Sequence, residues 1–165
     1  MMKSKYLIIF VLLYILSVFQ TIYYYLILQN IIPFHYNVFG IADSWGTKHY
    51  FSLIVFIVFT FIFSLFLLIS NTLHRIPDNF INLPNKDFWL SIENKDSTIE
   101  YIKNKLLEFG CVFLLFNIII FEIIYQSDML YLNKLLINPL YIVIILMIYT
   151  IIFCITLFKH FKIIK

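Results

Sequence analysis

The most chemically varied residues of this sequence lie in one short segment, 33–48, between two long apolar runs. The segment carries an imidazole on His35, a carboxylate on Asp43 and an ammonium group on Lys48. Imidazole and carboxylate groups can bind zinc or transfer protons, and neighbouring aromatic side chains can hold the apolar part of a ligand. This segment is therefore the first candidate for a binding site.

The same segment contains residues that favour tight, well-defined turns. Pro33 fixes its own φ, Asn37 can hydrogen-bond to nearby backbone groups, and Gly40 can adopt a positive φ at no steric cost. Because these residues surround His35, we expect its imidazole to project from a rigid backbone.

Acidic and basic side chains inside the apolar runs are confined to the third run, which contains Glu108 and Glu122, with the uncharged Asn117 between them. In a helix, fourteen residues at 100° each bring Glu122 to within about 40° of Glu108, so the two share a face. They rise about 21 Å apart, too far to interact. Glu108 can pair with Lys105, three residues earlier. Glu122 is expected about one turn below the outer surface, with three candidate partners: Lys48, His35 and His49.

The composition indicates a membrane protein. Of 165 residues, 62% are apolar and 13% are charged, about half the charged fraction of a soluble domain. Runs at 6–28, 50–70, 106–125 and 139–158 are each long enough to cross the hydrocarbon core as helices. Their continuous hydropathy is unlike the alternation of barrel strands. The predicted fold is all-α: a single polytopic membrane domain, 1–165, with four transmembrane helices in a small bundle.

The basic residues predict the orientation of this bundle. Two flank the side of the spans that bears segment 29–49, Lys48 and Lys134. Ten flank the other side: Lys3, Lys5, Arg75, Lys86, Lys95, Lys103, Lys105, Lys159, Lys162 and Lys165. Because positive charge is retained in the cytoplasm, both termini are expected there and segment 29–49 outside. The net charge of +3 is then an insertion signal, and no nucleic-acid partner is expected. The first run exceeds the apolar core of a signal peptide, so we expect it to be retained.

The longest stretch between spans, 71–105, has mixed charges and is expected to form a cytoplasmic loop. From Asp96 it predicts a polar helix, with Ser97 as a possible N-cap and Glu100 three residues later. Apolar residues recur there at helical spacing, so we expect this helix to lie along the inner interface and lead into the third span.

Catalytic motifs are not recognisable in this sequence: it has no phosphate-binding glycine loop, nucleophile elbow, CxxC pair or HExxH helix. No catalytic residue, cofactor or metal is therefore assigned. A zinc site could be assembled from His35 and Glu122 with either Asp43 or His49, but this spacing does not identify one. The two cysteines, Cys111 and Cys154, both lie within predicted spans and imply no disulfide framework.

The polar segment after the first span resembles a known family. The pattern falls on nine residues: Pro33, His35, Tyr36, Asn37, Gly40, Asp43, Trp45, Gly46 and Lys48. It resembles the bacterial "domain of unknown function 1648" membrane proteins, which include the N-terminal part of the sporulation-delaying-toxin immunity proteins. Two positions depart from the family pattern: Ala42 stands where a proline is frequent, and Gln29 stands where an earlier proline usually precedes the motif. The segment 82–90 is similar to part of the short four-span members.

Three functions are consistent with these features. The resemblance implies an immunity-like or sensing protein of a bacterial cytoplasmic membrane, which binds an extracytoplasmic peptide or lipid. Its apolar contacts would come from Trp45, Tyr36 and Phe39, and its polar contacts from His35, Asp43 and Lys48. Alternatively, the motif segment only ties the helices of a structural or accessory subunit together. The third possibility is a metalloenzyme built on the zinc ligands named above.

Overall fold

The computed structural model describes residues 5–162 and is mostly helical. Four long helices account for most of the chain: α1 (Lys5–Ile27), α2 (Lys48–Thr72), α4 (Lys95–Met129) and α5 (Pro139–Lys162). Two strands, β1 (Ile31–Tyr36) and β2 (Ala42–Thr47), form an antiparallel hairpin between α1 and α2. The remaining elements are short and lie between α2 and α4: η1 (Leu73–Arg75), η2 (Asp78–Phe80) and α3 (Lys86–Trp89).

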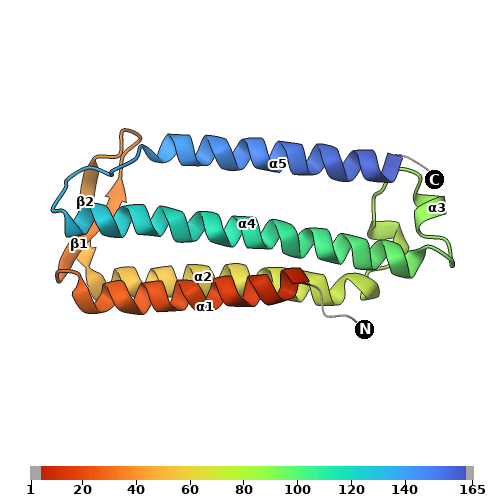
Figure 1. Ribbon diagram of the computed structural model, residues 1–165, viewed down its shortest axis with the longest axis horizontal. Coiled ribbons are helices and arrows are strands. Elements are labelled where there is room, and N and C mark those ends of the chain that lie inside the picture. Colours follow the sequence, from red (N-terminus) through yellow and green to blue (C-terminus); the bar gives the residue numbers. More distant parts are fainter. Residues whose placement is uncertain (1–4, 163–165) are drawn as a thin grey trace.

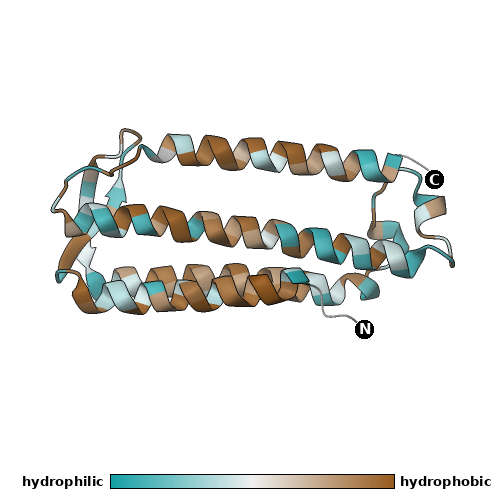
Figure 2. Cartoon of the chain, in the orientation of Figure 1, coloured by the Kyte–Doolittle hydropathy of each residue, from teal (hydrophilic) through white to brown (hydrophobic). Residues whose placement is uncertain are grey.

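The long helices run side by side along one axis (Figure 1). We call the end that holds β1, β2 and the connection 130–138 the hairpin end, and the opposite end, which holds residues 73–94 and the end of α5, the clasp end. Helices α1, α2 and α4 pack against one another, and α5 packs against α4. Apolar residues fill the middle of each helix, whereas hydrophilic residues gather toward the ends (Figure 2).

All four long helices are long and apolar enough to cross a membrane. This confirms the four apolar spans that the sequence predicts and indicates a multi-pass membrane protein. Helix α5 is the least enclosed, since only 6% of its apolar stretch is buried within the protein. Its remaining apolar surface suits contact with lipid, where apolar side chains lose nothing by being exposed.

The core lies where α1, α2 and α4 meet. Phe10, Val55, Phe59, Leu107 and Leu114 are fully buried there. Aromatic rings stack across the α1–α2 contact, with Tyr14 and Phe63 at a centroid separation of 4.2 Å. The Tyr14 and Thr60 hydroxyls form a hydrogen bond of 3.0 Å across this contact.

Two buried hydroxyl residues of α1 form hydrogen bonds within their own helix. Ser17 and Thr21 are buried, but each donates to a carbonyl of its own helix, at 2.7 Å and 2.9 Å. Because both side chains are small, they allow α1 to approach its neighbours closely.

Three details correct the sequence prediction. Residues 31–47 form a hairpin, so the fold is not purely α-helical. The stretch after Asp96 is helical and leads into the third span as predicted, but it is the first part of α4, which runs unbroken from Lys95 over 35 residues, about 52 Å. Ser97 does not cap it: Asn94 stands at the N-cap, and the Ser97 hydroxyl donates to the Asn94 carbonyl at 2.8 Å.

The clasp end holds the last turn of α5 in place. Trp89 Nε1 donates to the Phe161 carbonyl at 2.8 Å, and Asn85 Nδ2 donates to the Lys162 carbonyl at 2.9 Å. The His160 ring stacks on Tyr101 at 4.0 Å. Helix C-termini expose carbonyls without intrahelical partners, so these side chains cap α5. The segment 82–90, which resembles part of the short four-span family members, therefore has a structural role.

The basic residues divide between the two ends as the sequence predicts, although Lys3 and Lys165 lie outside the described residues. Lys48 begins α2 at the hairpin end, and Lys134 lies in the connection 130–138. The other described lysines and Arg75 lie in the half of the bundle toward the clasp end.

Gly110 provides a test of the packing. A Cβ built on it would lie 3.0 Å from the Phe66 ring and 3.2 Å from the Phe10 ring. We expect Gly110→Phe to destabilise the protein by about 1–3 kcal/mol, because overpacking displaces these rings. Thermal unfolding in detergent measures the loss. The control is Leu115→Phe on the exposed face of α4; equal melting temperatures for both variants would contradict this packing.

Candidate functional site

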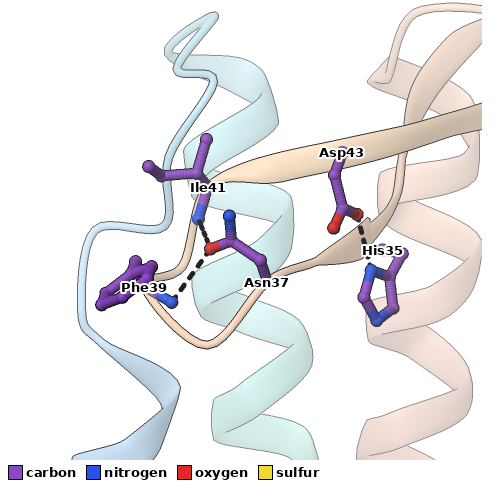
Figure 3. Close-up of polar contacts among 5 residues, drawn as sticks. All are labelled: His35, Asn37, Phe39, Ile41 and Asp43. Carbon is purple, nitrogen blue, oxygen red and sulfur yellow. Dashed lines mark hydrogen bonds and ion pairs between the residues drawn. The ribbon is translucent and has the colours of Figure 1, made fainter.

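The hairpin is shaped by its turn, as the sequence predicts. Asn37 Oδ1 accepts hydrogen bonds from the Phe39 and Ile41 amides at 2.9 Å and 3.1 Å (Figure 3). Gly40 has a φ of 74°, which only glycine adopts without strain. Both expected turn features are thus confirmed, and they fix the tip of the hairpin.

His35 and Asp43 face each other across the two strands (Figure 3). His35 Nδ1 lies 2.5 Å from Asp43 Oδ1. The strand register shifts on both sides of His35, so Ser44, not Asp43, is its backbone partner. The side chains remain 69% and 44% exposed. An ion pair this exposed contributes about 0–1 kcal/mol to stability, so both groups are available to a ligand at little cost.

Three other motif residues make contacts within the protein. Pro33 is buried, and Gly46 lies against Phe34, whose ring would be 2.9 Å from a Cβ at this position. Lys48 Nζ donates to the Leu28 carbonyl at 2.9 Å, where a cation satisfies an unpaired carbonyl just after α1. The expected polar contact from Lys48 to a ligand is therefore taken up within the protein.

The aromatic residues of the motif differ in exposure. Trp45 and Phe39 are 53% and 66% exposed and can contact a ligand as expected. Tyr36 is only partly exposed, and its hydroxyl is buried with no hydrogen-bond partner within residues 5–162. Burial raises the pKa of Tyr36 to about 12, and the charge of nearby Asp128 adds to the shift. Its phenol is consequently neutral and is not a surface contact.

A small cavity lies beneath the hairpin, between β1, β2 and the end of α4. The connection 130–138 closes one side, because the Ala42 amide donates to the Asn133 carbonyl and the Leu135 amide to the Gly40 carbonyl. The cavity has a volume of about 170 Å³. We call it the hairpin cavity; its lining comprises Gln29, Ile31, Pro33, Trp45, Asp128, Tyr131, Leu132 and Asn133.

Asp128 is the functional candidate that sequence reasoning missed. It is 8% exposed, and its Oδ2 atom has no hydrogen-bond partner among the described residues. An acceptor left without a donor in a buried site is costly, and a carboxylate more so. The residue was overlooked because it lies just beyond the predicted third span, where a carboxylate is unremarkable by sequence alone.

Glu122 does not meet the hairpin. Its carboxylate accepts hydrogen bonds from Gln20 Nε2 at 2.8 Å, the Tyr24 hydroxyl at 2.6 Å and Gln126 Nε2 at 3.0 Å. The expected partners bond elsewhere: His49 to Tyr25, His35 to Asp43 and Lys48 to Leu28. Sequence reasoning placed Glu122 opposite the loop, but the neighbouring helix α1 supplies donors at the same depth.

Glu108 and Asn117, the other two polar residues predicted within the third span, make local contacts within α4. Lys105 Nζ lies 2.8 Å from Glu108 Oε2, which confirms the expected pair. Asn117 Nδ2 donates to the Phe113 carbonyl of its own helix at 2.8 Å. Neither Glu108 nor Asn117 lines the hairpin cavity.

The zinc site considered from the sequence does not form. Within residues 5–162, no group of three or more His, Cys, Asp and Glu side chains is placed to hold a metal ion. His35 and Asp43 are together, but Glu122 bonds to α1 and His49 to Tyr25.

Comparison of the chain with protein-family profiles, curated proteins and solved structures finds no match. The relationship suggested by segment 33–48 therefore stays a prediction that rests on those residues.

The hairpin turn gives a local prediction. Asn37→Ala removes the acceptor of two backbone amides and should cost about 1 kcal/mol of local stability. We expect the Phe39 and Ile41 amides to exchange hydrogen roughly fivefold faster, measured by NMR or mass spectrometry. Asn37→Asp keeps an oxygen acceptor and serves as the control. Unchanged exchange in Asn37→Ala would show that this side chain does not hold the turn.

Proposed function

We propose that this protein is an immunity-like or sensing protein of a bacterial cytoplasmic membrane. Its hairpin end faces the extracytoplasmic side and binds a peptide that carries a basic group. The peptide's basic group enters the hairpin cavity, and its apolar side chains contact the aromatic residues around the cavity.

The observation that carries the proposal is that Asp128 lines the hairpin cavity and that its buried Oδ2 atom has no hydrogen-bond partner among the described residues. A buried carboxylate favours an incoming cation that donates hydrogen bonds, which describes a lysine or arginine side chain or a peptide amino terminus. The volume of about 170 Å³ is close to cavities of about 150 Å³ that hold a benzene-sized group. Trp45 lines the same cavity and offers a ring face for a cation.

The surface around the cavity suits the rest of a peptide. Ile31, Trp45 and Tyr131 line the cavity and are each more than half exposed, at 57%, 53% and 79%. Phe39 is a further exposed aromatic side chain, at the hairpin tip. Exposed aromatic side chains on a rigid backbone favour binding, because little conformational entropy is lost when they are covered.

The alternative is a structural or accessory role. It is favoured by the internal contacts of three motif residues: Pro33 is buried, Gly46 lies against Phe34 within the hairpin, and Lys48 donates to the Leu28 carbonyl. On this alternative, His35→Ala lowers thermal stability and leaves ligand binding unchanged. The exposure of the His35–Asp43 pair argues for binding, because an exposed pair adds little to stability and leaves both groups accessible to a ligand.

The peptide proposal is tested by binding to the protein in lipid nanodiscs. The probe is a fluorescein-labelled synthetic peptide of alternating lysine and leucine, and a glutamate–leucine peptide is its anionic counterpart. We expect the lysine peptide to bind nanodiscs that contain the protein more tightly than empty nanodiscs. Asp128→Asn should weaken this binding roughly tenfold or more, since a hydrogen bond to a charged group contributes about 1.5–3 kcal/mol. Fluorescence anisotropy measures both effects.

The matched control is Asp87→Asn, which removes an exposed carboxylate at the clasp end. It should bind the lysine peptide like the unmodified protein. Equal binding to protein-containing and empty nanodiscs would overturn the proposal and leave the structural role.

The orientation is tested by labelling single cysteines in a background with Cys111 and Cys154 replaced by alanine. Ser44→Cys at the hairpin end should react with a membrane-impermeant maleimide in intact cells. Ile92→Cys, fully exposed at the clasp end, should react only after the membrane is opened. The reverse pattern would place the hairpin in the cytoplasm and contradict the positive-inside prediction.

A further inference from the structure

A second site lies on the side of the bundle, in a groove between α1 and α4 that is separate from the hairpin cavity. The groove has a volume of about 460 Å³. Leu16, Phe19 and Ile118 form apolar parts of its lining, and Gln20 and Glu122 contribute the polar groups. Leu16 and Phe19 are 51% and 66% exposed on helix faces that lie within a predicted span. The groove therefore opens toward lipid.

The carboxylate in this groove has no counter-charge. Its three hydrogen-bond donors, Gln20, Tyr24 and Gln126, are all neutral side chains. No lysine, arginine or histidine within residues 5–162 forms an ion pair with Glu122. It lies seven residues before the end of α4, about 10 Å along the helix axis. An ionisable group at such a position is expensive and marks a functional site.

Gln20 supplies a second, independent sign of a missing ligand. It is only 9% exposed, and its Oε1 atom has no hydrogen-bond partner among the described residues. Its Nε2 atom donates to both the Ile118 carbonyl, at 3.0 Å, and Glu122 Oε2, at 2.8 Å. These two acceptors fix the amide orientation, since the flipped amide would place an oxygen against two oxygens. The groove thus contains a buried acceptor that lacks a donor.

We propose that the α1–α4 groove binds a single-chain membrane amphiphile whose headgroup is a primary ammonium ion. A primary ammonium carries one positive charge and three N–H donors, so it can neutralise Glu122 and donate to Gln20 Oε1. The apolar chain lies along Leu16, Phe19 and Ile118. An anionic headgroup does not fit, because no residue of the lining carries a positive charge.

The proposal is tested by native mass spectrometry of the purified protein in a non-ionic detergent. The probes share one chain length and differ in the headgroup: dodecylamine, dodecanol and dodecyltrimethylammonium. We expect dodecylamine to form a one-to-one complex at concentrations roughly tenfold below those that the other two require. Dodecanol tests the need for charge, and the trimethylammonium ion, which has the charge and no N–H donor, tests the need for hydrogen bonding.

Three variants locate the site. Glu122→Gln removes the charge and should weaken dodecylamine binding roughly tenfold or more. Leu16→Trp fills the groove with an indole, leaves the Glu122 hydrogen bonds in place and should also weaken binding, so the test does not depend on the stability of Glu122→Gln. Glu108→Gln changes another carboxylate of α4, which lies outside the groove, and should bind like the unmodified protein.

The proposal is overturned if dodecylamine binds no better than dodecanol, or if Glu122→Gln and Leu16→Trp both bind it as the unmodified protein does. Neither result bears on the peptide proposal, because the probes and variants of the two experiments address different cavities.

Discussion

Side chains that satisfy the exposed carbonyls at helix ends determine how this bundle is arranged. Hydrocarbon offers no hydrogen bonds, so backbone that leaves the helix must find partners within the protein. After α1, Lys48 reaches back to the Leu28 carbonyl and so draws the start of α2 toward the end of α1. At the other end of the bundle, Asn85 and Trp89 bond to the last carbonyls of α5. The Lys48–Leu28 contact holds the end of α1 close to the start of α2, and the hairpin connects these two neighbouring ends.

The parts of the fold that follow from hydropathy and local backbone preference could be predicted from the sequence. The four spans needed only continuous apolar runs, and the hairpin tip needed only the preferences of Asn37 and Gly40. The Lys105–Glu108 pair is equally local, because its members are one helical turn apart. The two strands were missed because Pro33, Asp43 and Gly46 are poor strand formers. The strands nevertheless form, because they pair with each other and form hydrogen bonds with the connection 130–138.

The candidate sites were harder to predict because they depend on which helices are neighbours. Gln20 and Tyr24 lie about a hundred residues before Glu122 along the chain, and nothing local links them to it. Asp128 becomes notable only when the connection 130–138 folds over it and encloses its carboxylate. The same reasoning explains why the nine motif residues divide as they do. Their spacing identifies a compact segment, whereas packing decides that Pro33 is buried and that His35 and Trp45 stay exposed.

Glu122 and Asp128 create two separate acceptor sites on one end of α4. Six residues separate them, which corresponds to about 9 Å of rise and about 120° of rotation around the helix. One carboxylate therefore faces the lipid-side groove, while the other lies under the hairpin. Acidic groups at the hairpin end, Asp43, Glu122 and Asp128, outnumber the lysines there, Lys48 and Lys134. The clasp end has the opposite balance, with most of the lysines and Arg75. The negative balance at the hairpin end produces an electric field that attracts cations. Both acceptor sites lie toward that end.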